Sequence, residues 1–201
     1  MVSKLSALTL GSLAILAVAT AAPAAAQRYS DSFTFLEAIR KGNSTDVMRL
    51  VSEPGSTVIN TRDTATGDAA LHIVTRARDM NYLSFLLGKG AKSSIQNNRG
   101  ETPLGLAAQL GWAEGAQVLL ATGAPVDQPD HAGETPLIKA VHRRDSAMVR
   151  LLLSRGADPS RADSVAGYSA LDYAKQDRRS AAILRLLQTE ARPRASIGPT
   201  R

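Results

Sequence analysis

The sequence predicts an all-α solenoid of about five helix–turn–helix units, and three periodic features lead to that prediction. A glycine recurs at intervals of 33, 33 and 34 residues, and a leucine follows each one four positions later: Gly67 and Leu71, Gly100 and Leu104, Gly133 and Leu137, Gly167 and Leu171. Glycine followed by alanine recurs every 33 residues, at Gly90, Gly123 and Gly156. The pentapeptide Gly-Glu-Thr-Pro-Leu occurs at 100–104 and again at 133–137. Such a period is typical of stacked identical units, which present a surface rather than enclose a pocket.

Each unit is expected to contain a short helix and a second, leucine-rich helix. Thr102 and Thr135 precede proline, and a threonine cap followed by proline at the first helical position is a common helix start. The second helices carry apolar runs at 118–120 and 149–153 and should close at the next glycine-alanine pair. One unit cannot cover its own apolar side, so the periodic leucines are expected to form a core shared between neighbours.

This order of elements resembles the ankyrin repeat, whose pattern is Gly-x-Thr-Pro-Leu-His, a short helix, a leucine-rich helix and Gly-Ala-Asp. The resemblance covers residues 33–189, and we expect units at about 33–66, 67–99, 100–132, 133–166 and 167–189. The first unit lacks the Thr-Pro start and is similar to an N-terminal capping repeat. The resemblance implies that His72 hydrogen-bonds within its turn. It also places Arg78, Arg144 and Arg178 where the family prefers glycine, which implies local strain if the backbone is left-handed there.

The first 26 residues read as a secretory signal, with Lys4 ahead of an uncharged apolar run and alanines before a cleavage point after Ala26. An uncleaved membrane anchor is the alternative, although a run of about fifteen residues is short for a bilayer. Residues 27–32 would then form a short N-terminal arm, and 190–201 a disordered basic tail. The processed protein should be periplasmic or secreted, with no transmembrane segment. The sequence contains no cysteine, so no disulfide stabilises it.

The residues do not match a catalytic, metal-binding or cofactor-binding pattern. The sequence has no nucleophile elbow, no phosphate-binding loop before Lys-Ser/Thr and no His-Glu-x-x-His. The three histidines lack a second ligand at a zinc-like spacing. After loss of Lys4 the excess is 23 basic minus 18 acidic residues, or +5, which favours acidic partners and anionic surfaces without specifying one. Nucleic acid is not expected, because the basic positions lack interleaved aromatic residues.

The resemblance implies that a partner is held by the turn tips and by the exposed ends of the first helices. Carried over position by position, the tip residues are Asn98, Arg99, Glu101, His131, Glu134 and Tyr168. The helix-end residues are Arg40, Lys41, Arg76, Gln109, His142 and Arg143. Many of the helix-end residues are basic, and stacking would line them up as a basic strip facing an acidic segment of a partner. The alternative is that basic side chains lie at helix C-termini because the helix dipole favours them there.

These observations together predict a non-catalytic protein–protein interaction module of the cell envelope, acting as an adaptor, an inhibitor or a protector. It should need no cofactor and should be a monomer. A different class of function is attachment to an anionic envelope surface through the basic strip and the tail. A hydrolase is the weakest alternative, because a solenoid of short repeats encloses little volume from which water is excluded.

Overall fold

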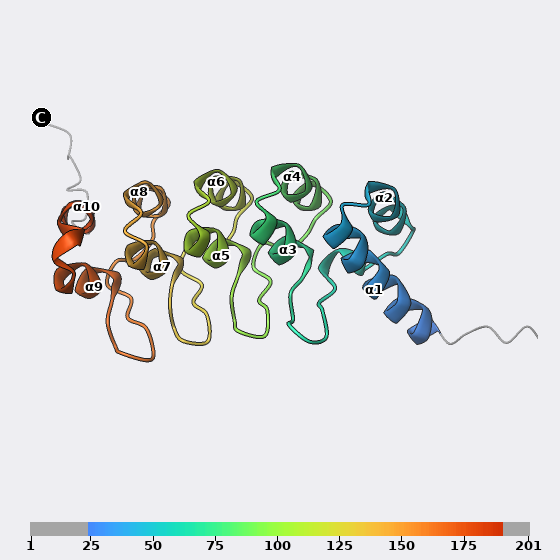
Figure 1. Ribbon diagram of the computed structural model, residues 1–201, viewed down its shortest axis with the longest axis horizontal. Coiled ribbons are helices and arrows are strands. Elements are labelled where there is room, and N and C mark those ends of the chain that lie inside the picture. The colour runs from blue at the N-terminus through green and yellow to red at the C-terminus, as the bar shows by residue number, and fades with distance from the viewer. Residues whose placement is uncertain (1–23, 191–201) are drawn as a thin grey trace, which may run out of the picture.

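The protein, seen in a computed structural model that describes residues 24–190, is a row of five helix pairs joined by long loops (Figure 1). The first helices of the pairs form one row: α1 (Ala24–Lys41), α3 (Ala70–Ala77), α5 (Pro103–Leu110), α7 (Pro136–His142) and α9 (Ala170–Gln176). The second helices form another: α2 (Ser44–Ser52), α4 (Met80–Gly88), α6 (Ala113–Ala121), α8 (Ser146–Ser154) and α10 (Ala181–Glu190). Short 3₁₀ helices lie at Val58–Asn60 and Arg178–Ser180. The expected all-α repeat architecture is confirmed; within 24–190 the β-structure is limited to two isolated bridges.

The helices begin where side chains can satisfy free backbone N–H groups. Thr102 and Thr135 accept hydrogen bonds from the N–H groups of Gly105 and Ile138, with the prolines at the first helical positions as expected. Two of the second helices have acidic caps instead: Asp79 caps α4, and Asp145 accepts from the second and third N–H groups of α8. The starts of these helices therefore follow from local sequence.

The core runs the length of the row between neighbouring units. Leu104 and Leu137 are completely buried, as are Leu83, Leu119 and Leu152 of the second helices. Each helix pair therefore covers the apolar side of the next, as the periodic leucines predict. At the C-terminal end no further unit follows among the described residues, and Leu171 is half-buried.

Four long loops, here called fingers, project from the first-helix row (Figure 1). Main-chain hydrogen bonds join each finger to the next. The N–H groups of Asn98, His131 and Ser164 donate to carbonyls of the preceding finger at 3.0, 3.0 and 2.9 Å. The close approach explains three of the periodic glycines. A Cβ on Gly100, whose φ is +75°, would lie 2.6 Å from the backbone nitrogen of His131. At Gly67, Gly100 and Gly133 finger–finger packing therefore requires glycine in addition to the positive φ, whereas Gly167 has open space around it.

The structure corrects one expectation about the arginines at family glycine positions. Arg78 and Arg144 do adopt left-handed backbone, with φ of 54° and 57°. Arg178 does not, because it lies in the 3₁₀ helix that leads into α10. At this last unit the chain therefore links its helices without a left-handed residue.

The two ends of the chain bear on the expected domain limits. Residues 27–32, expected as an arm, are helical and belong to α1. Residues 1–23, which hold most of the expected signal, and 191–201, which make up nearly all of the expected tail, lie outside the described residues. Among the helices of 24–190, none combines the length and apolar character needed to cross a bilayer.

Candidate functional site

The inner face of the protein, formed by the fingers and the first helices, is built around one recurring Asx position. Asp63, Asn97, Asp130 and Asp163 occupy it in the four fingers. One side-chain oxygen of each accepts hydrogen bonds from N–H groups two to four residues later, which closes the finger turn. In Asp163 this oxygen accepts three such bonds, from Val165, Ala166 and Gly167. The Asx residues make the fingers rigid supports for the residues at their tips.

The second oxygen of each aspartate faces a first helix and takes a donor from it. Arg40 Nη2 lies 2.7 Å from Asp63 Oδ2, and Lys139 Nζ lies 2.6 Å from Asp130 Oδ2. In the last finger the Tyr173 hydroxyl donates to Asp163 at 2.5 Å. Hydrogen bonds from the backbone of Thr66 and from Arg40 lower the pKa of Asp63 to about 2. The bond to Asp163 raises the pKa of the Tyr173 phenol to about 12.

Asn97 differs from the aspartates because its neighbours are themselves acidic. Its amide nitrogen donates to Asp68 Oδ1 at 2.9 Å and to Glu101 Oε2 at 2.8 Å. Arg76 and Arg99 complete this cluster: Arg76 bonds Asp68 at 3.0 Å, and Arg99 bonds Glu101 at 2.7 Å. The two carboxylates and two guanidinium groups balance, and the amide links them without adding charge.

His72 joins this cluster to the turn that starts α3. It is fully buried; its Nδ1 accepts from the Ala69 N–H at 3.0 Å, so its Nε2 must donate to the Glu101 carbonyl at 2.9 Å. The expected turn-network role of His72 is confirmed. Ala69 has no side chain that could accept a hydrogen bond from the helix N–H groups, and the imidazole makes the reciprocal bond of a capping box by accepting from the Ala69 N–H. Burial lowers the pKa of His72, because the charged imidazolium would lose its hydration in the interior.

The comparison with known families identifies this arrangement. A family model described as ankyrin repeats (3 copies) matches residues 35–130 and again 116–196. The chain is an ankyrin-repeat protein. A search of curated proteins gave no match. Ankyrin repeats generally mediate binding between proteins, and they are typically non-catalytic. Among the described residues no three His, Cys, Asp or Glu side chains converge as a metal site would require.

The expected contact residues of the ankyrin-repeat surface fall into two groups. One group is already engaged in the fold. Glu101, expected at an exposed tip, is instead 6 % exposed and belongs to the Asn97 cluster. Arg40 pairs with Glu37 and Asp63, Lys41 shares Glu37, and Arg76 binds Asp68. Much of the basic strip is therefore neutralised by carboxylates of the ankyrin repeats themselves.

The second group is open to a partner. Its members lie on finger tips or at first-helix ends and are exposed or half-buried: Asn98, Arg99, Gln109, His131, Glu134, His142, Arg143 and Tyr168. Asn98 is held by Arg62 and by the Ala65 carbonyl, and Glu134 by Lys139. The backbone N–H of Arg143 bonds the Lys139 carbonyl, but its guanidinium group makes no hydrogen bond or ion pair with the described residues. These positions run along the inner face from the second finger to the fourth.

Sequence reasoning missed Lys139, Asp163 and Tyr173 as parts of this face. Lys139 and Tyr173 occupy a helix position that is apolar in the two preceding units, where Ile73 and Leu106 stand. A polar residue at a repeat position that is apolar in the other units was the signal by which the sequence could have identified them. Lys139 is only 7 % exposed, so its charge depends on Asp130 and Glu134 beside it.

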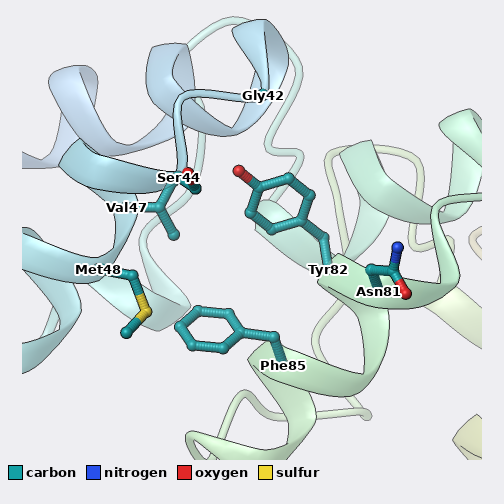
Figure 2. Close-up of a pocket in the computed structure, with 7 residues that line it drawn as sticks. All are labelled: Gly42, Ser44, Val47, Met48, Asn81, Tyr82 and Phe85. Carbon is teal, nitrogen blue, oxygen red and sulfur yellow. The ribbon is translucent and has the colours of Figure 1, made fainter.

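A separate apolar groove of about 380 Å³ lies between α2 and α4, on the second-helix row away from the fingers (Figure 2). Val47, Met48 and Phe85 supply its apolar walls, with Tyr82 beside them. Met48 is 48 % exposed at a helix position that carries Ser84 in the next unit. The Tyr82 hydroxyl is buried and has no hydrogen-bond partner among the described residues. The groove is lined mainly by apolar side chains, and no charged residue is among those that line it.

Proposed function

We propose that this ankyrin-repeat protein binds a partner protein through its fingers and the inner side of its first helices, without catalysis. The observation that supports the proposal is that this face combines loops held by hydrogen bonds with tips that remain exposed. Asx-capped turns and finger-to-finger main-chain bonds hold the loops rigid, while the tips above them stay exposed. A rigid surface loses little conformational entropy when it binds, which favours affinity. An adaptor, an inhibitor or a protector of another protein would each use such a surface.

Arg143 provides the sharpest test of this proposal. It lies at the end of α7, is exposed, and makes no ion pair within 24–190, so Arg143→Glu should leave the unfolding curve nearly unchanged. Arg150 on α8 is a matched control, since Arg150→Glu makes the same charge change on the second-helix row. We expect affinity capture from the envelope fraction, read by mass spectrometry, to lose its partner with Arg143→Glu and to keep it with Arg150→Glu. Equal capture by both variants would contradict the proposed face.

Location in the cell envelope is part of the same proposal and rests on the N-terminal sequence. Cleavage after Ala26 would remove the first three residues of α1. The residues of α1 that are described as buried, Phe35, Leu36, Ala38 and Ile39, all lie beyond that point and would stay in the processed chain. The mass of the protein recovered from the periplasm or the medium tests this directly. A mass that still includes residues 1–26 would argue for an anchored form.

Attachment to an anionic surface receives less support. The alternative needs free cations on the inner face, but Arg40, Arg76 and Arg144 each have a carboxylate partner. Exposed paired charges contribute little attraction at physiological salt. Sedimentation with anionic vesicles, with and without residues 190–201, separates the two functions. Vesicle binding that vanishes with the tail while partner capture persists would favour the surface-attachment function.

A further inference from the structure

The last two units carry an aromatic cluster on the inner face that no other described junction has. The His142 and Tyr173 ring centroids lie 4.4 Å apart at an interplanar angle of 61°. Tyr168 meets the same Tyr173 edge-to-face, with centroids 5.6 Å apart and an angle of 86°. His142 comes from α7, Tyr173 from α9 and Tyr168 from the fourth finger. Three elements thus bring their rings together, and Tyr168 keeps 42 % of its surface exposed.

Carboxylates surround this cluster. Glu134 Oε1 lies 3.4 Å from His142 Nε2, and Asp163 accepts the Tyr173 hydroxyl. We call Glu134, His142, Asp163, Tyr168 and Tyr173 the acid–aromatic patch. A tyrosine ring flanked by carboxylates is attractive to a cation, because the ring face and the carboxylates both present negative potential.

The charges beneath the patch do not balance. Asp130, Glu134 and Asp163 contribute three carboxylates, and the buried Lys139 contributes one ammonium group. The neighbouring arginines are directed elsewhere: Arg144 pairs with Asp177 at 2.6 Å, and the Arg143 guanidinium lies beside Gly111 of the preceding unit. The high pKa of Tyr173 keeps its phenol neutral near pH 7. An excess of two negative charges remains.

The junction between the second and third units provides an internal comparison. There the two carboxylates of Asp68 and Glu101 face the two guanidinium groups of Arg76 and Arg99, so the charge is already compensated. The position after the finger glycine holds an acid in that junction, whereas the fourth finger holds Tyr168. The acid–aromatic patch is the part of the inner face where an incoming cation would find both free charge and an exposed ring.

We propose that the acid–aromatic patch binds a positively charged side chain, arginine or lysine, of the partner protein. The cation packs on Tyr168, and the half-buried Glu134 supplies the opposing charge at the surface. Asp163 is only 6 % exposed and bonded to Tyr173, so it contributes negative potential from below the rings rather than a direct contact. Val165, on the same finger and 81 % exposed, offers an apolar contact for the residue next to the cation. Tyrosines of this kind are frequent binding hot spots. The inference rests on the proposed protein-binding function. It predicts a basic partner side chain at this patch, whereas the basic strip predicts an acidic partner segment.

The test uses the whole processed chain and a synthetic probe, the peptide acetyl-Gly-Arg-Gly-Arg-Gly-amide. Its neutral counterpart carries citrulline in place of both arginines. In a ¹⁵N NMR titration at low salt, we expect saturable shifts of the arginine peptide at residues 134–142 and 163–173, and much weaker shifts with citrulline. Tyr168→Ala should weaken binding roughly three- to ten-fold, as expected for the loss of one cation–π contact.

Matched variants separate this site from general attraction to acidic residues. Glu134→Gln should weaken the arginine peptide, whereas Glu114→Gln on α6, an exposed acid outside the patch, should not. Equal binding of both peptides, shifts spread over all exposed acids, or unchanged affinity in Tyr168→Ala would each overturn the inference. Partner capture reports on the broader proposal separately. If the peptide fails to bind while Arg143→Glu still abolishes capture, the inner face binds a protein but not through a cation on this patch.

Discussion

Replacing Asn97 by aspartate is the most demanding test of the charge arrangement on the inner face. The change adds almost no volume, and aspartate is the residue found at the same position in the other three fingers. On sequence grounds it should therefore be harmless. In the structure Asn97 is 3 % exposed and donates to two carboxylates, Asp68 at 2.9 Å and Glu101 at 2.8 Å. Asn97→Asp removes both donors and places a third carboxylate against the other two.

The magnitude follows from those contacts. Each lost bond to a charged acceptor is worth about 1.5–3 kcal/mol, and leaving buried charges uncompensated costs about 3–5 kcal/mol in total. Arg76 and Arg99 remain nearby and soften the repulsion, so we expect the free energy of unfolding to fall by about 3 kcal/mol at pH 7.5. At pH 5 the loss should shrink, because one carboxyl of the three can bind a proton and donate in place of the amide.

Urea unfolding followed by circular dichroism at both pH values measures the effect. Asp130→Asn serves as the matched control, since it makes the reverse change in a finger where Lys139 is the partner. A repeat array can unfold in stages, so amide hydrogen exchange should confirm that the loss begins in the second and third units. Asn97→Asp within about 1 kcal/mol of the parent, or equal losses at pH 7.5 and pH 5, would refute the reasoning.

Three further predictions follow from single contacts. The folded state lowers the pKa of His72 below its usual 6.5, so its contribution to the free energy of unfolding should be complete above pH 6.5 and decline as the pH falls below that value. Thermal melts over this pH range test the prediction, and His72→Ala should lack this pH dependence. Tyr82→Phe should leave the free energy of unfolding unchanged or raise it slightly, because it removes a buried hydroxyl that has no hydrogen-bond partner among the described residues. If urea unfolding showed a loss above about 1 kcal/mol, the hydroxyl would have to be hydrogen-bonded. At Arg78 and Arg144, glycine variants should be more stable than alanine variants by about 1 kcal/mol. Both variants lose the arginine's bond to the next unit, but only alanine keeps the left-handed strain. Calorimetry showing alanine above glycine would contradict the φ values.

The candidate site was only partly predictable from sequence. The list of finger-tip and helix-end positions came from the repeat spacing, and Tyr168, His142 and Arg143 do lie open on the inner face. The spacing could not show that Glu101 is buried or that Arg40 and Arg76 are already paired. The Arg40–Asp63 and Arg76–Asp68 pairings join residues 23 and 8 positions apart and depend on how each finger lies against the first helices.

The sequence by itself determined the repeat, the helix starts and the core. Threonine-proline caps, glycine turns and leucines at a fixed period act within one unit or between identical neighbours, so they can be read in order along the chain. Only the tertiary structure decided the electrostatic character of the inner face. Whether Asp130 or Asp163 faces a lysine, an arginine or a tyrosine is settled by what the adjacent helix places against it. The Coulomb energy of a charge depends on its distance from other charges and on its burial, and the spacing of residues along the sequence gives neither quantity.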